Sequence, residues 1–149
     1  ITDINQDTLK TISAKYNAEV VSLDGIYDVD MDIYAPCALG ATLNTENIAR
    51  LKCGVVSGAA NNQLADEFVH GPMLESKGIL YAPDFLINAG GLINVYSELH
   101  GYDRKVAIQH TEAIYETTLE VFRKATTEKI STIEAAKKIA EERIAGSRQ

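Results

Sequence analysis

Short apolar runs alternate with segments of helical periodicity along most of the chain. The runs are predicted as strands, the first as the end of one, at residues 1–4, 19–23, 32–35, 54–57 and 79–82. Strands that alternate with helices through short connections indicate an α/β fold with a parallel sheet and right-handed crossovers. Because such sheets bind ligands at the carboxyl ends of their strands, chemistry is expected in the loops that follow these runs.

Capping residues and helix breakers bound the helices predicted in the first half of the chain. Asn5 is placed to cap a helix whose apolar face carries Leu9, Ile12 and Tyr16. A short helix with Ile48 and Leu51 is expected after residues 44–45. A longer helix is predicted over residues 63–77, with an interruption at residues 71–72, where the proline restarts the helix from its first position. Gly78 is expected to end it.

The pattern becomes helical from Asn88 almost to the end of the chain. Asp103 is placed to cap a long helix, one side of which carries Val106, His110, Ile114, Val121 and Ala125. Ser131 and Glu134 form a capping-box pattern that opens a last helix, and Gly146 is well placed to stop it.

Composition and charge narrow the functional classes without changing this fold. The 149 residues are 46% hydrophobic and 23% charged, which suits one globular domain with a sizeable core. The net charge of −7 disfavours a nucleic-acid partner, because a phosphate backbone needs a basic face. No apolar run approaches the ~20 residues of a membrane span, and no segment is typical of a signal peptide, so a cytoplasmic protein is expected.

The cysteines and histidines do not indicate a metal site. Cys37 and Cys53 are isolated, fit no metal-ligand or redox spacing, and are expected to be reduced, small core residues. The three histidines, His70, His100 and His110, are scattered along the sequence, so no zinc site is expected.

An acidic residue follows the first apolar run. In a dinucleotide-binding fold, an acid at the end of the second strand accepts hydrogen bonds from the adenosine ribose and repels the extra phosphate of NADP. Asp3 fits this role. The alternative is that Asp3, beside Asn5, belongs to a turn or a helix cap.

Three further loops after predicted strands are built of small residues: Ala35–Ala41, Ser57–Asn62 and Asn88–Gly91. Small side chains let a ligand approach the backbone closely, and asparagine amides suit a carboxamide such as that of nicotinamide. One such loop would be an ordinary turn, whereas three at the same sheet edge favour a shared ligand crevice. Leu92 and Val95 share a helical face next to the last loop, where they line an apolar pocket or belong to the core.

Residues 32–41, 57–63 and 81–95 resemble the glutamate/leucine/phenylalanine/valine dehydrogenase superfamily, and leucine dehydrogenases in particular. The resemblance covers essentially the whole chain. It implies a Rossmann-like doubly wound sheet and the NAD-dependent oxidative deamination of an L-amino acid to a 2-oxo acid and ammonia. In that reaction the nicotinamide takes the hydride and the protein supplies position and electrostatics.

The resemblance also implies roles for individual residues. Cofactor-binding positions are Asp3, Ile4, Cys37, Ala38, Leu39, Asn61 and Asn62. Asn88 matches a residue that touches the substrate head group, and Leu92 and Val95 match two positions that shape the side-chain pocket. Glutamate-specific members carry Ser where Val95 stands, so a branched-chain substrate is expected, although phenylalanine dehydrogenases are hard to exclude.

Parts of the enzyme that the resemblance implies are expected outside this chain. The sequence opens at Ile1 directly in an apolar stretch, so the first strand, the glycine-rich turn and a domain with the catalytic Lys and Asp are expected before it. Residues 1–149 are then a partial NAD-binding domain, whose mainly helical part, 87–149, packs toward that missing domain. No catalytic acid or base is assigned within this chain. The chain alone is therefore expected to be inactive and to bind NAD weakly. The full-length protein is expected to be a homo-oligomer.

Two other functional classes remain open at this point. One is a non-catalytic nucleotide-binding regulatory module, which needs no amino-acid pocket beside the nicotinamide site. The other is an assembly domain that uses its two C-terminal helices as an interface and binds neither NAD nor an amino acid. Fold alone does not separate these classes from an enzyme.

Overall fold

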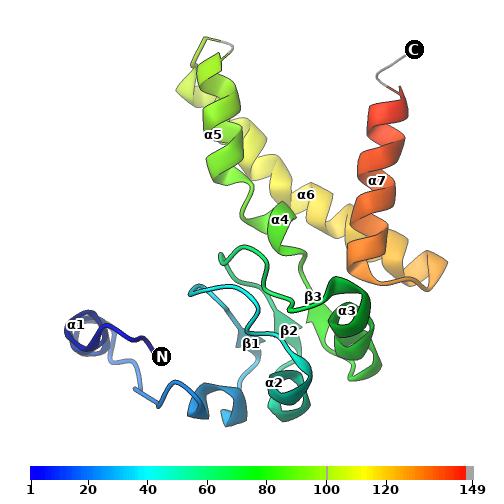
Figure 1. Cartoon of the computed structure of the whole chain (residues 1–149). Coiled ribbons are helices and arrows are strands. Elements are labelled where there is room, and N and C mark those ends of the chain that lie inside the picture. The colour runs from blue at the N-terminus through cyan, green and yellow to red at the C-terminus, as the bar shows by residue number, and fades with distance from the viewer. Residues whose placement is uncertain (100, 147–149) are drawn as a thin grey trace.

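A small parallel sheet lies at the centre of the molecule (Figure 1). The computed structural model describes residues 1–99 and 101–146. Strands β1 (Ile33–Tyr34), β2 (Val55–Val56) and β3 (Leu80–Tyr81) pair in chain order, all parallel. Helices α2 (Thr45–Arg50) and α3 (Glu67–Ser76) connect them, which confirms the mixed α/β class and three of the predicted strands.

One face of the sheet carries the main core. Tyr34, Val56 and Tyr81 are buried, whereas Ile33 and Leu80, which alternate with them on the other face, are 59% and 39% exposed. The buried face packs against side chains from the connecting segments and from helix α7 (Thr132–Gly146), among them Leu43, Ile48, Leu51, Leu74 and Ile133. Three strands of two residues each are therefore stabilised chiefly by this one-sided apolar packing.

The predicted strands at residues 1–4 and 19–23 are wrong. The backbone N–H group of Val21 donates to the carbonyl of Ile1 at 3.0 Å, and the amino group of Ile1 donates to the carbonyl of Glu19 at 2.6 Å. These two bonds resemble a parallel pairing, but among the described residues neither run joins the three-stranded sheet. Among the described residues the two runs share only these two bonds, and such a short pairing does not make a strand of either run.

Helix α1 (Gln6–Tyr16) lies to one side of the sheet (Figure 1). The side chain of Asn5 accepts a hydrogen bond from Thr8 N–H, which confirms the predicted cap. Only Leu9 of the predicted apolar face is buried; Ile12 and Tyr16 are 37% and 64% exposed. The periodicity identified the helix correctly, but that face is largely uncovered.

Helix α3 is continuous through Gly71 and Pro72, so the predicted interruption is wrong. It also begins at Glu67, later than predicted, where Asp66 accepts hydrogen bonds from two N–H groups of the first turn. Pro72 is exposed and removes one helical hydrogen bond, whereas His70, Gly71 and Leu74 around it are buried. At Gly71 an added Cβ would lie 3.0 Å from Ile133 Cδ1, so this glycine allows close packing between helices.

The end of α3 follows the prediction. Gly78 has a positive φ of 75°, and its backbone N–H donates to the carbonyl of Glu75. A glycine adopts this left-handed conformation without the strain of a side chain, so it ends the helix and leads the chain into β3.

The second half of the chain is helical, as predicted, and rises from the sheet (Figure 1). It consists of α4 (Asp84–Ile87), which the sequence did not indicate, α5 (Gly90–Leu99), α6 (Arg104–Glu128) and α7 (Thr132–Gly146). Helices α6 and α7 share a second apolar cluster made of Val121, Ala125, Ala135, Ala136 and Ile139. Among the described helices, none has the length and hydrophobicity that crossing a bilayer requires.

The predicted caps of α6 and α7 are present. Asp103 accepts hydrogen bonds from Lys105 N–H and Val106 N–H, and Ser131 Oγ accepts from Glu134 N–H. The predicted buried side of α6 is only partly correct. Val106 and His110 are exposed, and in this first part of the helix the buried residue is Ala107.

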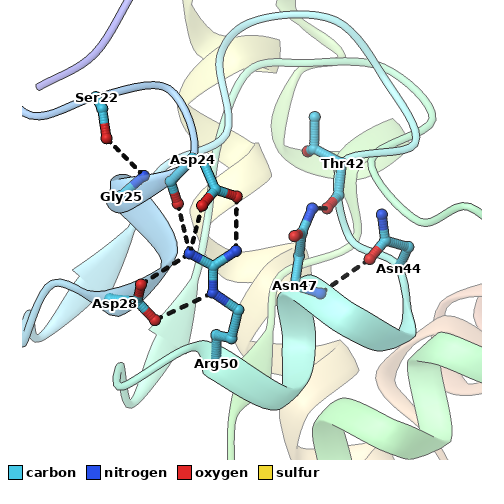
Figure 2. Close-up of polar contacts among 8 residues, drawn as sticks. All are labelled: Ser22, Asp24, Gly25, Asp28, Thr42, Asn44, Asn47 and Arg50. Atoms are coloured by element: carbon cyan, nitrogen blue, oxygen red, sulfur yellow. Dashed lines mark hydrogen bonds and ion pairs between the residues drawn. The ribbon is translucent and has the colours of Figure 1, made fainter.

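An arginine ties helix α2 to the preceding turn, η1 (Gly25–Asp28). Figure 2 shows the guanidinium of Arg50 between the carboxylates of Asp24 and Asp28, at N–O distances of 2.7 and 2.8 Å. Hydrogen bonds from this guanidinium hold the pKa of each carboxyl below its usual range. On the other side of the helix, Asn47 Nδ2 donates to the carbonyl of Thr42 at 2.8 Å. Helix α2 therefore fixes the chain on both sides of β1.

Candidate functional site

The loops that follow β1 and β2 are joined by backbone hydrogen bonds. Ala60 N–H donates to the carbonyl of Pro36 at 3.0 Å, and Ala41 N–H donates to the carbonyl of Asn62 at 2.7 Å. Ala41 and Asn62 both have left-handed backbones, with φ values of 59° and 52°. Conformations this uncommon persist where surrounding contacts fix them, so the two loops define one another's shape.

A glycine permits the closest approach between these loops. A Cβ atom built on Gly58 would lie 2.2 Å from the carbonyl oxygen of Pro36, which is far inside contact distance. The small residues of this loop therefore allow backbone to pack directly against backbone.

The chain after β3 reaches the same edge. The side-chain amide of Asn88, at the end of α4, donates a hydrogen bond to Asn61 Oδ1. The carboxylate of Asp84, at the start of α4, accepts from Gln63 N–H at 3.2 Å. All three predicted loops thus meet at the carboxyl end of the strands, and Asn61 and Asn88 are in direct contact.

A cleft of about 620 Å³ brings together residues predicted for the cofactor. Its lining includes Asp3 together with Cys37, Ala38 and Leu39. Ile4 is not part of this lining, and its side chain is 80% exposed. One acidic group thus lies in the same cleft as a loop of small side chains and Leu39.

The carboxylate of Asp3 takes part in a local turn. Its Oδ1 atom accepts a hydrogen bond from Asn5 N–H at 2.7 Å, so the turn considered from the sequence is present. The side chain is nevertheless exposed and lines the cleft. A carboxylate has acceptor sites on both oxygens, so this turn leaves Asp3 able to accept further hydrogen bonds.

Asn61 and Asn62 face a different hollow from Asp3. A second cleft, of about 520 Å³, is lined by both asparagines together with Asp66, Asp84 and Phe85, among others. Both asparagine side chains are exposed. The structure therefore separates the predicted cofactor residues into one group around Asp3 and another around Asn61.

The predicted pocket residues lie beyond Asn88, on α5. Leu92 and Val95 are 73% and 54% exposed, so they do not belong to either buried cluster. The core alternative for these two residues is therefore wrong in this structure. They present apolar surface one to two helical turns from the Asn61–Asn88 contact.

One of the two cysteines departs from the prediction. Cys37 is exposed, and its sulfur accepts from Ala59 N–H at 3.4 Å, because it lies in the loop that contacts the 57–62 segment. It is therefore not a core residue. Cys53 is half-buried and packs against the main cluster, and burial raises the pKa of its thiol.

Buried phenols at this end of the sheet are poor proton donors or acceptors at neutral pH. Burial raises the pKa of Tyr34 and of Tyr81 well above the usual value, so both side chains stay neutral. Within residues 1–99 and 101–146, no group of three or more His, Cys, Asp or Glu side chains is arranged to hold a metal ion. His70 bonds to Asp66 N–H and Thr45 Oγ1, His110 is exposed, and His100 lies outside the described residues.

Gln63 and Asp84 were not identified as site residues from the sequence. Gln63 is fully buried, and its Nε2 atom donates to the carbonyls of Gly58 and Ala60 at 2.7 and 2.9 Å. Its burial is not visible in the sequence, because it follows two exposed asparagines in a polar loop. A long polar side chain at the end of a glycine-containing loop was the only available signal.

Comparisons with known proteins identify what the chain is similar to. A family model described as glutamate/leucine/phenylalanine/valine dehydrogenase matches residues 2–149. A leucine dehydrogenase from Thermoactinomyces intermedius is 54% identical over 144 residues, which are 97% of this chain and 39% of that protein. A phenylalanine dehydrogenase from Caldalkalibacillus thermarum is 42% identical over 149 residues, covering 97% of this chain and 40% of its own length.

A solved structure agrees over the whole described fold. The crystal structure of L-tryptophan dehydrogenase from Nostoc punctiforme superposes with a TM-score of 0.96 at 45% sequence identity. The match covers 99% of this chain and 45% of that one. The chain therefore spans less than half the length of the relatives it matches.

Proposed function

This chain belongs to the glutamate/leucine/phenylalanine/valine dehydrogenase family, and we propose that it forms the NAD-binding part of an amino-acid dehydrogenase. The reaction converts an L-amino acid, NAD and water into a 2-oxo acid, ammonia, NADH and a proton. When bound, the nicotinamide supplies the chemistry by accepting a hydride at its C4 atom.

The observation that carries this proposal is the meeting of Asn61 and Asn88 at the carboxyl edge of the sheet. Their side-chain amides offer both donors and acceptors, which match the nicotinamide carboxamide and a substrate head group. We assign Asn61 and Asn62 to the nicotinamide and its ribose, and Asn88 to the substrate. The close backbone packing at Gly58 supports this assignment. It holds the loop against the backbone of Pro36, while the side chains of Asn61 and Asn62 remain exposed and free to contact a ligand.

The cleft beside Asp3 suits the adenosine side of the cofactor. We assign the Asp3 carboxylate to the ribose hydroxyls, and Cys37, Ala38 and Leu39 to apolar and backbone contacts beside them. Ile4, which is not part of the cleft lining, is assigned to the cofactor as the neighbour of Asp3. The small side chains of this loop let a ligand approach the backbone. A carboxylate at this place repels a 2′-phosphate, so NAD is the proposed cofactor rather than NADP.

The same cleft supports a Rossmann-like doubly wound sheet in the whole protein. The carbonyl of Tyr34 accepts from the N–H group of Ser57, directly after β2. Because backbone groups alternate in direction along a strand, those of Ile33 and Ala35 point away from β2, toward the cleft. We propose that a further parallel strand of the whole protein lies between residues 1–3 and β1. Residues 1–149 are then part of the NAD-binding domain, and the helical part, 87–149, packs toward a substrate domain.

An apolar amino acid is the proposed substrate. Leu92 and Val95 present exposed aliphatic side chains near Asn88, and neither can compensate the desolvation of a glutamate side-chain carboxylate. We therefore propose a branched-chain substrate such as leucine. Phenylalanine and valine are the alternative substrates within the family. Because the chain is also similar to a tryptophan dehydrogenase, tryptophan is a further substrate to test.

The proton chemistry is proposed to come from other parts of the whole protein. The chain's own phenols are held neutral by burial, and no lysine among the described residues lines the cleft beside Asp3 or the hollow beside Asn61. We propose that the chain alone is inactive with weak NAD affinity, and that the whole protein is a cytoplasmic homo-oligomer.

Steady-state kinetics of the whole protein test this proposal. NADH formation is measured with L-leucine, L-valine, L-isoleucine, L-phenylalanine, L-tryptophan and L-glutamate, each with NAD and with NADP. The expected result is the highest kcat/KM with a branched-chain substrate and NAD. A preference for an aromatic substrate would overturn the branched-chain assignment alone. NAD binding without turnover of any amino acid would overturn the enzymatic proposal in favour of a regulatory module.

A further inference from the structure

Gln63 is a fully buried polar residue that bonds to the chain segments following all three strands. Its carbonyl accepts from Leu43 N–H at 2.9 Å, which links it to the chain after β1. Its own N–H donates to Asp84 Oδ2 at 3.2 Å, which links it to α4. Its side chain bonds within the loop after β2. No other described residue of this loop combines a buried side chain with contacts to each of the three segments.

The orientation of the Gln63 amide is fixed by its partners. Nε2 donates to the carbonyls of Gly58 and Ala60, and a reversed amide would direct its oxygen at the same two carbonyl oxygens. Oε1 is buried and has no hydrogen-bond partner in the described structure. A buried acceptor without a partner costs free energy. We infer that the two hydrogen bonds donated by Nε2 to the loop carbonyls offset this cost.

The two bonds curl the loop around the Gln63 side chain. They hold the carbonyls of Gly58 and Ala60 inward, while the side chains of Asn61 and Asn62 remain exposed. The chain then turns through the left-handed backbone of Asn62 into Gln63 itself. The direction in which Asn61 points therefore depends on the Gln63 amide.

The backbone of Gln63 also sets the partner of Asn61. Asp84 begins the short helix α4, and Asn88 ends it. The bond from Gln63 N–H to Asp84 therefore fixes the start of the helix whose other end brings Asn88 to Asn61. We propose that Gln63 is a positioning residue that sets the geometry of the Asn61–Asn88 pair for the nicotinamide half of the cofactor; this inference rests on the proposed function.

Binding measurements on the whole protein test the inference with two ligands. NAD carries the nicotinamide, whereas ADP-ribose lacks it and keeps the rest of the dinucleotide. Gln63→Leu introduces an apolar side chain of similar size and removes both amide N–H donors. We expect the variant to raise the Kd for NAD about tenfold, because the Asn61 side chain loses its position at the nicotinamide. The Kd for ADP-ribose should stay within about twofold of its wild-type value.

A double-mutant cycle separates positioning from a general structural effect. If Gln63 acts through Asn61, Gln63→Leu has no further effect on the Kd for NAD when Asn61→Ala is already present. Equal losses for NAD and ADP-ribose, or losses that add in the double variant, would overturn the inference. If Asn61→Ala itself leaves NAD binding unchanged, the proposed function of the loop fails, which is a distinguishable result.

A second variant keeps the test valid if Gln63→Leu does not fold. Asp84→Ala removes the acceptor of Gln63 N–H from a half-buried position at the start of α4. We expect the same selective loss of NAD over ADP-ribose, and a smaller loss with Asp84→Asn, whose amide oxygen still accepts the bond. Unchanged NAD binding in Asp84→Ala would contradict the proposed link between Gln63 and the Asn61–Asn88 pair.

Discussion

The side-chain amide of Asn88 donates a hydrogen bond to the side-chain oxygen of Asn61, across 27 positions of sequence. Asn61 follows β2 and Asn88 follows β3, so the contact exists only because these parallel strands end at the same edge of the sheet. It joins a residue assigned to the cofactor to one assigned to the substrate. The pair therefore couples the two halves of the proposed site.

Removal of Asn88 is expected to impair catalysis rather than folding. In the whole protein, Asn88→Ala should lower kcat/KM for the amino acid at least about tenfold, because it removes a substrate contact and frees Asn61. Steady-state kinetics measure the change, and thermal melting should be nearly unchanged. Asn94→Ala is the matched control, since Asn94 is exposed on α5 and bonds to Glu98. Equal kinetics for the two variants would refute a role for Asn88.

Elements marked by local signals were predicted from the sequence. Residues 32–35, 54–57 and 79–82 each contain an observed strand, because each short apolar run is bounded by turn or capping residues. The caps at Asn5 and Asp103 were also predicted, since a side chain that caps a helix acts within three residues of itself.

Features that depend on distant neighbours were not predictable in the same way. Residues 19–23 are as apolar as a strand, but pairing requires a partner that the run itself does not encode. Gly71 was interpreted as a break in a helix, whereas its role is to let Ile133 of another helix approach. In both cases tertiary packing decides the outcome over local propensity.

The candidate site was predicted in part. The meeting of the small-residue loops follows from the parallel order of β1, β2 and β3, whereas the strand predicted before Asp3 is not observed. The buried amide of Gln63 and the left-handed backbone of Ala41 could not be predicted, because alanine rarely adopts a positive φ and nothing local indicates one. These two features arise from how the loops interlock.

Asp3 is expected to select the cofactor. Asp3→Asn keeps the size of the side chain but removes the charge that accepts ribose hydrogen bonds and repels a 2′-phosphate. We expect KM for NAD to rise about 10- to 100-fold in the whole protein, and the preference for NAD over NADP to shrink. Asp7→Asn, in the first turn of α1, is the control. An unchanged ratio of kcat/KM for the two cofactors would exclude this role.

The Arg50 cluster is expected to stabilise the fold in a pH-dependent way. Its guanidinium lowers the pKa of Asp24 and Asp28 below the usual 3.8, so the carboxylates favour the folded state above that pH and lose this effect as the pH falls through their folded-state pKa values. Arg50→Ala should therefore lower the melting temperature at neutral pH, with a smaller difference from wild type in acid. Arg143→Ala, which removes a single exposed ion pair with Glu120, should have less effect at neutral pH. A difference that grows in acid would contradict the assignment.

The backbone contact at Gly58 is expected to tolerate no side chain. Gly58→Ala places a Cβ against the carbonyl of Pro36 and should lower the free energy of unfolding by about 2–3 kcal/mol or more. The loss is large because the Cβ meets the backbone of Pro36, which cannot move aside as a flexible side chain can. Gly54 lies just before β2, and Gly58 follows that strand. In Gly54→Ala the added Cβ meets only the carbonyl oxygen of Asp32, at 3.8 Å, so the free energy of unfolding should change by about 0.5 kcal/mol or less. Urea unfolding measures both. Similar losses would show that the approach to Pro36 is not the cause.

Val95 is expected to set the preference for an apolar amino acid. Val95→Ser replaces exposed aliphatic surface on α5 with a hydroxyl, which weakens contact with a branched side chain and offers a hydrogen bond to a distal carboxylate. In the whole protein, kcat/KM for L-leucine should fall about tenfold, and the ratio of leucine to glutamate activity should fall with it. Ile108→Ser, on the partly exposed surface of α6, controls for a general effect of polarity. A leucine-to-glutamate ratio that stays at its wild-type value would show that selection lies elsewhere in the protein.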